Sequence, residues 1–184
     1  MAGTLTVQNL QGPSSGANAN KIIVPAGQTF IPSSGQVVQT VTNTSTANTN
    51  ITSSSTWVAL NETEISITPK MAGSKFIYTV SIGVEFDGTT FSGSNGLKPY
   101  YSINSGSYTA HTELMYAPNG DNTDAAQQCV TTVFPHSPTY TLGQTVAYKL
   151  YFYQTDSTGS HFNQQLSSMP QSSFVTNTLQ EIAP

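Results

Sequence analysis

The sequence predicts an all-β protein, an antiparallel β-sandwich or jelly roll preceded by an extended N-terminal arm. Aromatic residues make up 10% of the 184 residues, and Val and Thr are abundant, which favours strands. No segment keeps the three- and four-residue apolar spacing of an amphipathic helix over three turns. Roughly eight segments instead alternate polar and apolar residues between turns rich in Gly, Asn and Pro. This length suits one domain plus an arm.

Residues 1–35 are interpreted as the arm. Short apolar pieces recur there between Gly, Pro, Ser and Asn, so the segment cannot bury a core of its own. We expect an arm that becomes ordered against a neighbouring protein, in preference to a disordered tail. The apolar residues that would make this contact are Leu5, Val7, Leu10, Ile22, Ile23, Val24, Phe30 and Ile31.

Residues 36–56 are predicted to form a short strand over 36–41 and then a surface loop or linker. The run 42–56 consists almost entirely of Ser, Thr and Asn and has little to bury. Residues 57–184 then form the jelly-roll domain.

The clearest strand of that domain covers residues 76–86. Apolar or aromatic side chains occupy every second position, which predicts a half-buried antiparallel strand. Its inward residues are Phe76, Tyr78, Val80, Ile82, Val84 and Phe86. Noisier alternation predicts further strands over 62–68, 100–103, 108–116, 129–134, 146–153 and 174–182.

Charged residues are scarce. The chain has five lysines, no arginine and nine acidic residues, 8% of its length. The lysines are scattered, so we expect no nucleic-acid partner. No apolar window is long enough to span a membrane, and the N-terminus does not resemble a secretory signal, so we expect synthesis in a cytoplasm and no membrane partner.

Two acidic features could carry chemistry. Glu62 and Glu64 would share one face of a strand, as the paired carboxylates of a glycosidase flank one sugar, but a solvated face is the favoured interpretation. The loop 119–124 is rich in acidic and amide groups, yet it lacks the oxygen spacing of a calcium loop. We therefore predict no catalytic residue, no metal and no cofactor.

The remaining candidates are polar or sulfur-containing. His111, His136 and His161 lie far apart in the sequence and are interpreted as polar loop or rim residues, although one His per subunit could form a ring in a trimer. Cys129 is alone, so it forms no intrachain disulfide, and we expect a small buried hydrophobe.

Four tyrosines are predicted to fall out of phase with the core face: Tyr101, Tyr116, Tyr151 and Tyr153. Aromatic side chains outside the core suit a subunit interface or a sugar-binding surface. We prefer the interface.

Several short segments resemble structural proteins of tailed bacteriophages, especially marine and cyanobacterial phages. They cover about a third of the chain: 54–60, 65–69 with Ile-Thr-Pro, 73–78 with Ser-Lys, 174–184, and the N-terminal 5–12 and 27–32. The resemblance implies a jelly roll like that of tumour necrosis factor, assembled as a homotrimer, and it implies no catalytic residues. The chain has no room for the stalk of a long fibre.

These observations together predict a non-enzymatic virion structural protein on the particle exterior. It would decorate or cement the capsid, or form a short knob, and its arm would bind the major capsid protein or a tail protein. The alternative is the tip of a tail fibre that binds a receptor or a host surface glycan. A glycan hydrolase that uses Glu62 and Glu64 ranks third.

Overall fold

The computed structural model describes residues 14–16, 32–47, 49–51, 56–86, 95–111, 115–116, 126–154, 160–162 and 175–184. The chain divides into two compact units, residues 1–32 and residues 33–184. The eight apolar arm residues lie outside the described residues, as does the loop 119–124. The described residues contain no helix with the length and apolarity needed to cross a membrane.

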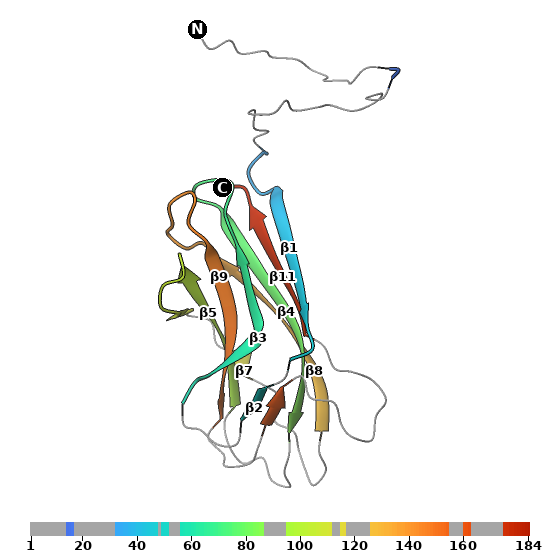
Figure 1. Cartoon of the computed structure of the whole chain (residues 1–184), viewed down its shortest axis with the longest axis vertical. Helices are drawn as coiled ribbons and strands as arrows, with labels where there is room; N and C mark the ends of the chain where they lie inside the picture. Colours follow the sequence, from blue (N-terminus) through green and yellow to red (C-terminus); the bar gives the residue numbers. More distant parts are fainter. Residues whose placement is uncertain are drawn as a thin grey trace. The chain divides into compact units, whose positions relative to one another are not determined.

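Residues 33–184 contain two antiparallel sheets (Figure 1). The larger sheet has the order β1-β11-β4-β10-β2, with β8 also paired to β4. Its strands are β1 (Val37–Ser45), β2 (Thr49–Ile51), β4 (Lys75–Phe86), β8 (Ala126–His136), β10 (Ser160–Phe162) and β11 (Val175–Ile182). The smaller sheet has the order β3-β9-β5-β6, with β7 also paired to β5. Its strands are β3 (Val58–Ile67), β5 (Asn95–Ile103), β6 (Thr109–Ala110), β7 (Met115–Tyr116) and β9 (Val146–Gln154).

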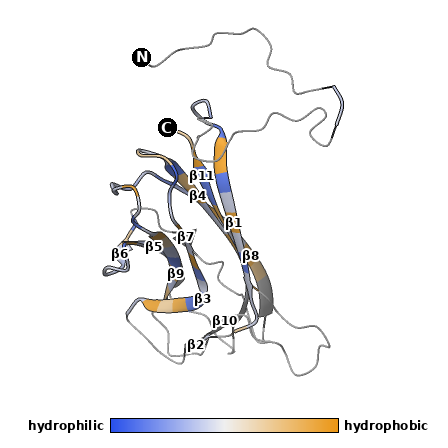
Figure 2. Cartoon of the chain, turned by 45° about the horizontal axis from the view of Figure 1, so that its top comes forward, coloured by the Kyte–Doolittle hydropathy of each residue, from blue (hydrophilic) through white to orange (hydrophobic). Residues whose placement is uncertain are grey.

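The all-β prediction is therefore confirmed. The chain passes repeatedly from one sheet to the other, so the long strands β1, β11, β4 and β8 lie side by side opposite β3, β9 and β5. Figures 1 and 2 show these two layers from different directions. Such alternation between two antiparallel sheets is consistent with a jelly roll.

The core lies between the layers. On β4, Phe76, Tyr78, Val80 and Ile82 are fully buried, while the side chains of Val84 and Phe86 lie outside the described residues. On the facing sheet, β9 buries Val146, Tyr148, Leu150 and Phe152. The ring centroids of Tyr78 and Tyr148 are 5.4 Å apart, so aromatic packing joins the two sheets directly.

Two predicted segments differ in the structure. The run 42–56 is not simply a loop, because β1 continues to Ser45 and β2 covers Thr49–Ile51. Hydroxyl and amide side chains form β1 because this strand pairs along its length with β11, and the hydrogen bonds of that pairing outweigh the low apolar content. The short strand β2 pairs with β10. Within the strand expected over 108–116, the described residues 108–111 and 115–116 contain the short strands β6 and β7, each paired with β5.

The turn after β5 contains two residues with a left-handed backbone. Asn104 and Ser105 have φ angles of 51° and 59°, and the Gly106 amide donates to the Ile103 carbonyl at 3.0 Å. Positive φ at both central residues is the signature of a type I′ turn, whose twist matches that of the flanking strands. This turn places Ser105, Gly106 and Tyr108 beside the outer face of the smaller sheet.

A buried carboxylate organises the connection between β3 and β4. Glu181 of β11 is fully buried and accepts hydrogen bonds from the backbone amides of Lys70 (3.0 Å) and Met71 (2.9 Å). Its carboxylate also accepts from Ser74 Oγ (2.8 Å) and Gln39 Nε2 (2.6 Å). Burial alone would raise the pKa of Glu181, but these donors outweigh burial and lower it.

Candidate functional site

The outer face of the smaller sheet carries a cluster of aromatic side chains, which we call the aromatic face. Its members are Trp57, Tyr100, Tyr108, Tyr151 and Tyr153, and each is only partly buried. Tyr100 and Tyr151 stack with their ring centroids 3.9 Å apart. The Trp57 ring lies 5.4 Å from that of Tyr153 and 6.5 Å from that of Tyr100. Tyr108 extends the row, with its ring 6.3 Å from that of Tyr151.

Two of the four predicted out-of-phase tyrosines, Tyr151 and Tyr153, belong to this face. The prediction was wrong for Tyr101, which is half-buried against the core with its ring 4.4 Å from that of His136. The reason is the alternation of β5, which places Tyr101 in phase with the fully buried Leu97. The side chain of Tyr116 lies outside the described residues. Trp57, Tyr100 and Tyr108 were not predicted as members.

A large bulge interrupts the pairing of β3 with β9. Leu60 pairs with Leu150 and Ile65 with Tyr148, so four residues of β3 stand opposite one residue of β9. The Thr63 hydroxyl accepts the Leu150 amide at 2.8 Å, and the Thr63 carbonyl accepts the Tyr78 hydroxyl at 2.7 Å. These bonds replace the ladder bonds that the bulge removes.

The bulge also separates the two glutamates that were expected to share a face. Glu62 is buried and accepts a 2.7 Å hydrogen bond from Thr49 Oγ1, and burial raises its pKa. Glu64 is exposed on the outer side. The prediction was wrong because the extra residues between Leu60 and Ile65 change the alternation of the strand.

Glu64 forms an ion pair with the largely buried Lys149. The distance from Lys149 Nζ to Glu64 Oε2 is 2.7 Å, and the Asn61 side-chain oxygen accepts from the same ammonium at 2.9 Å. The ammonium also lies 4.5 Å from the centre of the Tyr108 ring. Burial would raise the pKa of Glu64, but the hydrogen bonds from Lys149 and Tyr108, together with the charge of Lys149, outweigh burial and lower it.

A depression of about 240 Å³ opens beside the aromatic face. Its lining includes Glu64, Ser66, Ser102, Ser105, Tyr108 and Thr145. The Tyr108 hydroxyl is buried and interacts with the Glu64 carboxylate, but the two groups do not have ordinary hydrogen-bond geometry. Hydroxyls, one carboxylate and an aromatic ring therefore converge on one small polar site.

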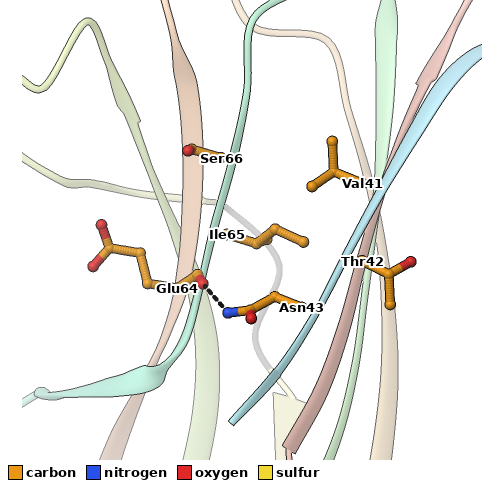
Figure 3. Close-up of a pocket in the computed structure, with 6 residues that line it drawn as sticks. All are labelled: Val41, Thr42, Asn43, Glu64, Ile65 and Ser66. Atoms are coloured by element: carbon orange, nitrogen blue, oxygen red, sulfur yellow. Dashed lines mark hydrogen bonds between the residues drawn. The ribbon is translucent and has the colours of Figure 1, made fainter.

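A second hollow, of about 340 Å³, lies between the edge strands β1 and β3 (Figure 3). Val41 and Ile65 point toward each other across it, and Asn43 Nδ2 donates to the Glu64 carbonyl at 3.5 Å. The Glu64 carboxylate points away from this hollow. This hollow is the seam where the two sheets meet at their edges.

The outer face of the larger sheet is chemically different, and we call it the hydroxyl face. Strand pairing sets its residues in three rows across β1, β11, β4 and β8. Each of these side chains is exposed or only partly buried, and none is charged. The rows are Thr40-Gln180-Ile77-Pro135, Thr42-Thr178-Thr79-Val133 and Thr44-Thr176-Ser81-Thr131.

Cys129 lies at the end of this face and is exposed, with its Sγ 3.4 Å from Ser81 Oγ. The expectation of a buried cysteine was wrong, because the alternation of β8 sends Val130 inward and Cys129 outward. Val133 is 56% exposed on the same face.

Two histidines that are distant in the sequence meet at one end of the sandwich. The ring centroids of His111 and His136 are 4.6 Å apart, and His136 Nδ1 lies 2.9 Å from the Tyr148 hydroxyl. Burial, and then the His111 ring, lower the pKa of His136 to about 4. The sequence spacing gave no sign of this pair, because His111, which follows β6, and His136 of β8 are brought together only by the fold. Across the described residues, no group of three or more His, Cys, Asp or Glu is placed to hold a metal ion.

Comparison with known proteins identifies no family. No family model matches the chain, and no curated protein matches it. One of the similar solved structures is described as "Structure of infectious bursal disease virus Gx strain", with a TM-score of 0.32 and 13% sequence identity. The match covers 89% of this chain, which spans only 42% of the length of that one. A likeness this low says nothing about function.

Proposed function

We propose that the chain is a non-enzymatic structural protein of a virion, assembled from copies of itself on the particle exterior. The more specific proposal is that a homotrimer decorates or cements the capsid of a tailed phage, or forms a short knob. Its N-terminal arm would bind the capsid or the tail. The observation that best supports self-assembly is the hydroxyl face, a regular array of twelve uncharged side chains.

An uncharged face is suited to contact with another protein surface. Removing a hydroxyl or amide from water costs much less than removing an ion, and the lost hydrogen bonds can be remade across the contact. The exposed Val133 and the half-buried Ile77 add apolar area. Because no charged side chain takes part in the three rows, this contact should depend little on salt.

The arm would supply the second contact. Extended segments gain affinity by adding to a sheet edge, which uses backbone hydrogen bonds and needs no charge. Three arms on one trimer would convert a weak contact per chain into strong binding through avidity.

The test of self-assembly is the mass of the full chain in solution, measured by size exclusion with light scattering. We expect about three times the 19.6 kDa of one chain, unchanged between low and moderate salt. Thr178→Lys places a charge at the centre of the hydroxyl face and should give monomers. Thr141→Lys, the same change in an exposed loop, should leave the oligomer intact. A monomeric wild-type chain at all concentrations would overturn the assembly proposal.

The virion role needs a separate measurement. Particles from the source sample are banded on a density gradient, and peptides of this chain are quantified against those of the major capsid protein. A constant ratio across the particle band supports the proposal. Recovery of the chain only from the unbanded soluble fraction contradicts it.

A further inference from the structure

The depression beside the aromatic face has the chemistry of a ligand site that subunit assembly does not use. It lies on the smaller sheet, on the opposite side of the sandwich from the hydroxyl face. Its lining is made of hydroxyls, a carboxylate and the edge of an aromatic row. Small-molecule sites combine such a hollow with a few convergent polar groups.

The charges in the depression are already paired. Glu64 forms its ion pair with Lys149, and Lys149 is only 8% exposed. A ligand therefore meets a carboxylate acceptor whose charge is neutralised by Lys149. An anionic ligand would face this carboxylate with no free cation in the lining, and a cationic ligand would compete with Lys149. An uncharged ligand encounters neither penalty.

The Tyr108 hydroxyl is the clearest unmet requirement. It is buried and interacts with the Glu64 carboxylate without ordinary hydrogen-bond geometry, and an incompletely satisfied buried hydroxyl is costly. Burial and the nearby Glu64 carboxylate raise the pKa of Tyr108, so the hydroxyl keeps its proton at neutral pH and is able to donate. A ligand oxygen in the depression would satisfy this donor.

The aromatic row supplies the apolar half of the site. Tyr108 lies 6.3 Å from Tyr151, which stacks on Tyr100, and Trp57 continues the row. A pyranose ring has hydroxyls around its edge and an apolar face of C–H groups. It can hydrogen-bond to Glu64, Ser66 and Tyr108 while its apolar face covers an aromatic ring. The volume of about 240 Å³ lies below the range for drug-sized ligands, which suits a single sugar ring.

We propose that the depression formed by Glu64, Ser66, Ser102 and Tyr108, with the adjoining Tyr151 ring, binds a neutral sugar residue of a glycan. The Tyr108 hydroxyl donates to the sugar, the Glu64 carboxylate accepts from it, and the Tyr100–Tyr151 stack supports its apolar face. Binding takes place on each chain separately, so it does not depend on the assembly proposed above.

The single tryptophan provides the measurement. Trp57 belongs to the aromatic face, so its fluorescence reports on this surface alone. The full chain is titrated with the methyl glycosides of glucose, galactose, mannose and N-acetylglucosamine, and then applied to an array of neutral, sialylated and sulfated glycans. We expect saturable quenching or a shift by at least one neutral sugar, and retention on neutral glycans of the array.

Substitutions then locate the site. Tyr108→Phe removes only the hydroxyl and should weaken binding about 3- to 10-fold. Tyr151→Ala removes the stacked ring and should weaken it about tenfold or more. Tyr101→Phe, on the core side, is the matched control and should bind as wild type, and Thr178→Lys should also retain binding. Circular dichroism verifies that each variant is folded.

Three results would overturn the site. One is the absence of any neutral sugar that binds, in both the titration and the array. Another is binding that is equal in wild type, Tyr108→Phe and Tyr151→Ala. The third is a preference for sialylated or sulfated glycans, which would assign this surface to an anionic ligand.

Discussion

Replacing Glu181 by Gln tests the role of the buried carboxylate. The change keeps the shape of the side chain but removes its charge and turns one oxygen into a donor. The two oxygens accept from Lys70, Met71, Ser74 and Gln39, so the new NH₂ group must face at least one of these donors. One buried donor left unpaired costs about 1–3 kcal/mol, and the remaining bonds lose their charge assistance.

We therefore expect Glu181→Gln to lower the free energy of unfolding by about 2–4 kcal/mol at pH 7. This is a large part of the about 5–15 kcal/mol typical of a domain, but the variant should still fold. The assay is urea unfolding followed by Trp57 fluorescence. Thr141→Ala, a change in an exposed loop, is the control and should alter the free energy of unfolding by no more than about 0.5 kcal/mol.

The pH dependence of the difference is a second, independent test. The folded pKa of Glu181 lies below its ordinary value of 4.5, so its stabilising effect is complete above that value and is lost as the pH falls through the folded pKa. The difference in the free energy of unfolding between wild type and Glu181→Gln should thus become smaller below about pH 4.5. A gap under about 0.5 kcal/mol at pH 7, within the range of ordinary surface changes, or one that does not shrink in acid, would refute the reasoning.

Three other predictions concern the core, the histidine pair and the arm. Val80→Asp places an unpaired charge among fully buried residues and should prevent folding, as judged by circular dichroism; a normally folded variant would contradict the inward face of β4. The pKa of His136 is lowered from 6.5 to about 4, so on acidification the unfolded chain binds a proton before the folded chain does. The free energy of unfolding of the wild type should therefore decrease as the pH is lowered from 6.5 to about 4. His136→Gln should show a shallower fall in its urea midpoint, and equal slopes would exclude this histidine as the cause. Deleting residues 1–35 should leave a soluble oligomer that no longer joins particles, whereas loading at wild-type occupancy would rule out the arm as the anchor.

Some of the fold could be predicted because the signal is local. Strands β4 and β9 place an apolar or aromatic residue at every second position, and this period of two results from a single buried face. No later pairing changes it, so the inward residues Phe76, Val80 and Leu150 can be identified without knowing the neighbouring strands. The all-β class follows from the same alternation repeated along the chain.

The surfaces could not be predicted in the same way, because they depend on pairing between distant strands. The bulge of β3 is defined only against β9, and it alone separates Glu62 from Glu64. Tyr100 and Tyr151 stack because β5 pairs with β9, more than forty residues later in the chain. Residues 42–45 likewise form part of a strand because β1 pairs with β11, although their composition indicates a loop.

The seam between β1 and β3 has a consequence for aggregation. Edge strands present open backbone groups to which a foreign strand can add. At this seam Asn43 Nδ2 donates to the Glu64 carbonyl, and Gln39 Nε2 donates to the Thr68 carbonyl at 2.8 Å. The amide side chains of β1 thus occupy acceptors along β3 that an incoming strand would need. Among the long strands described, this leaves the outer edge of β8, interrupted by Pro135, as the more accessible place for strand addition.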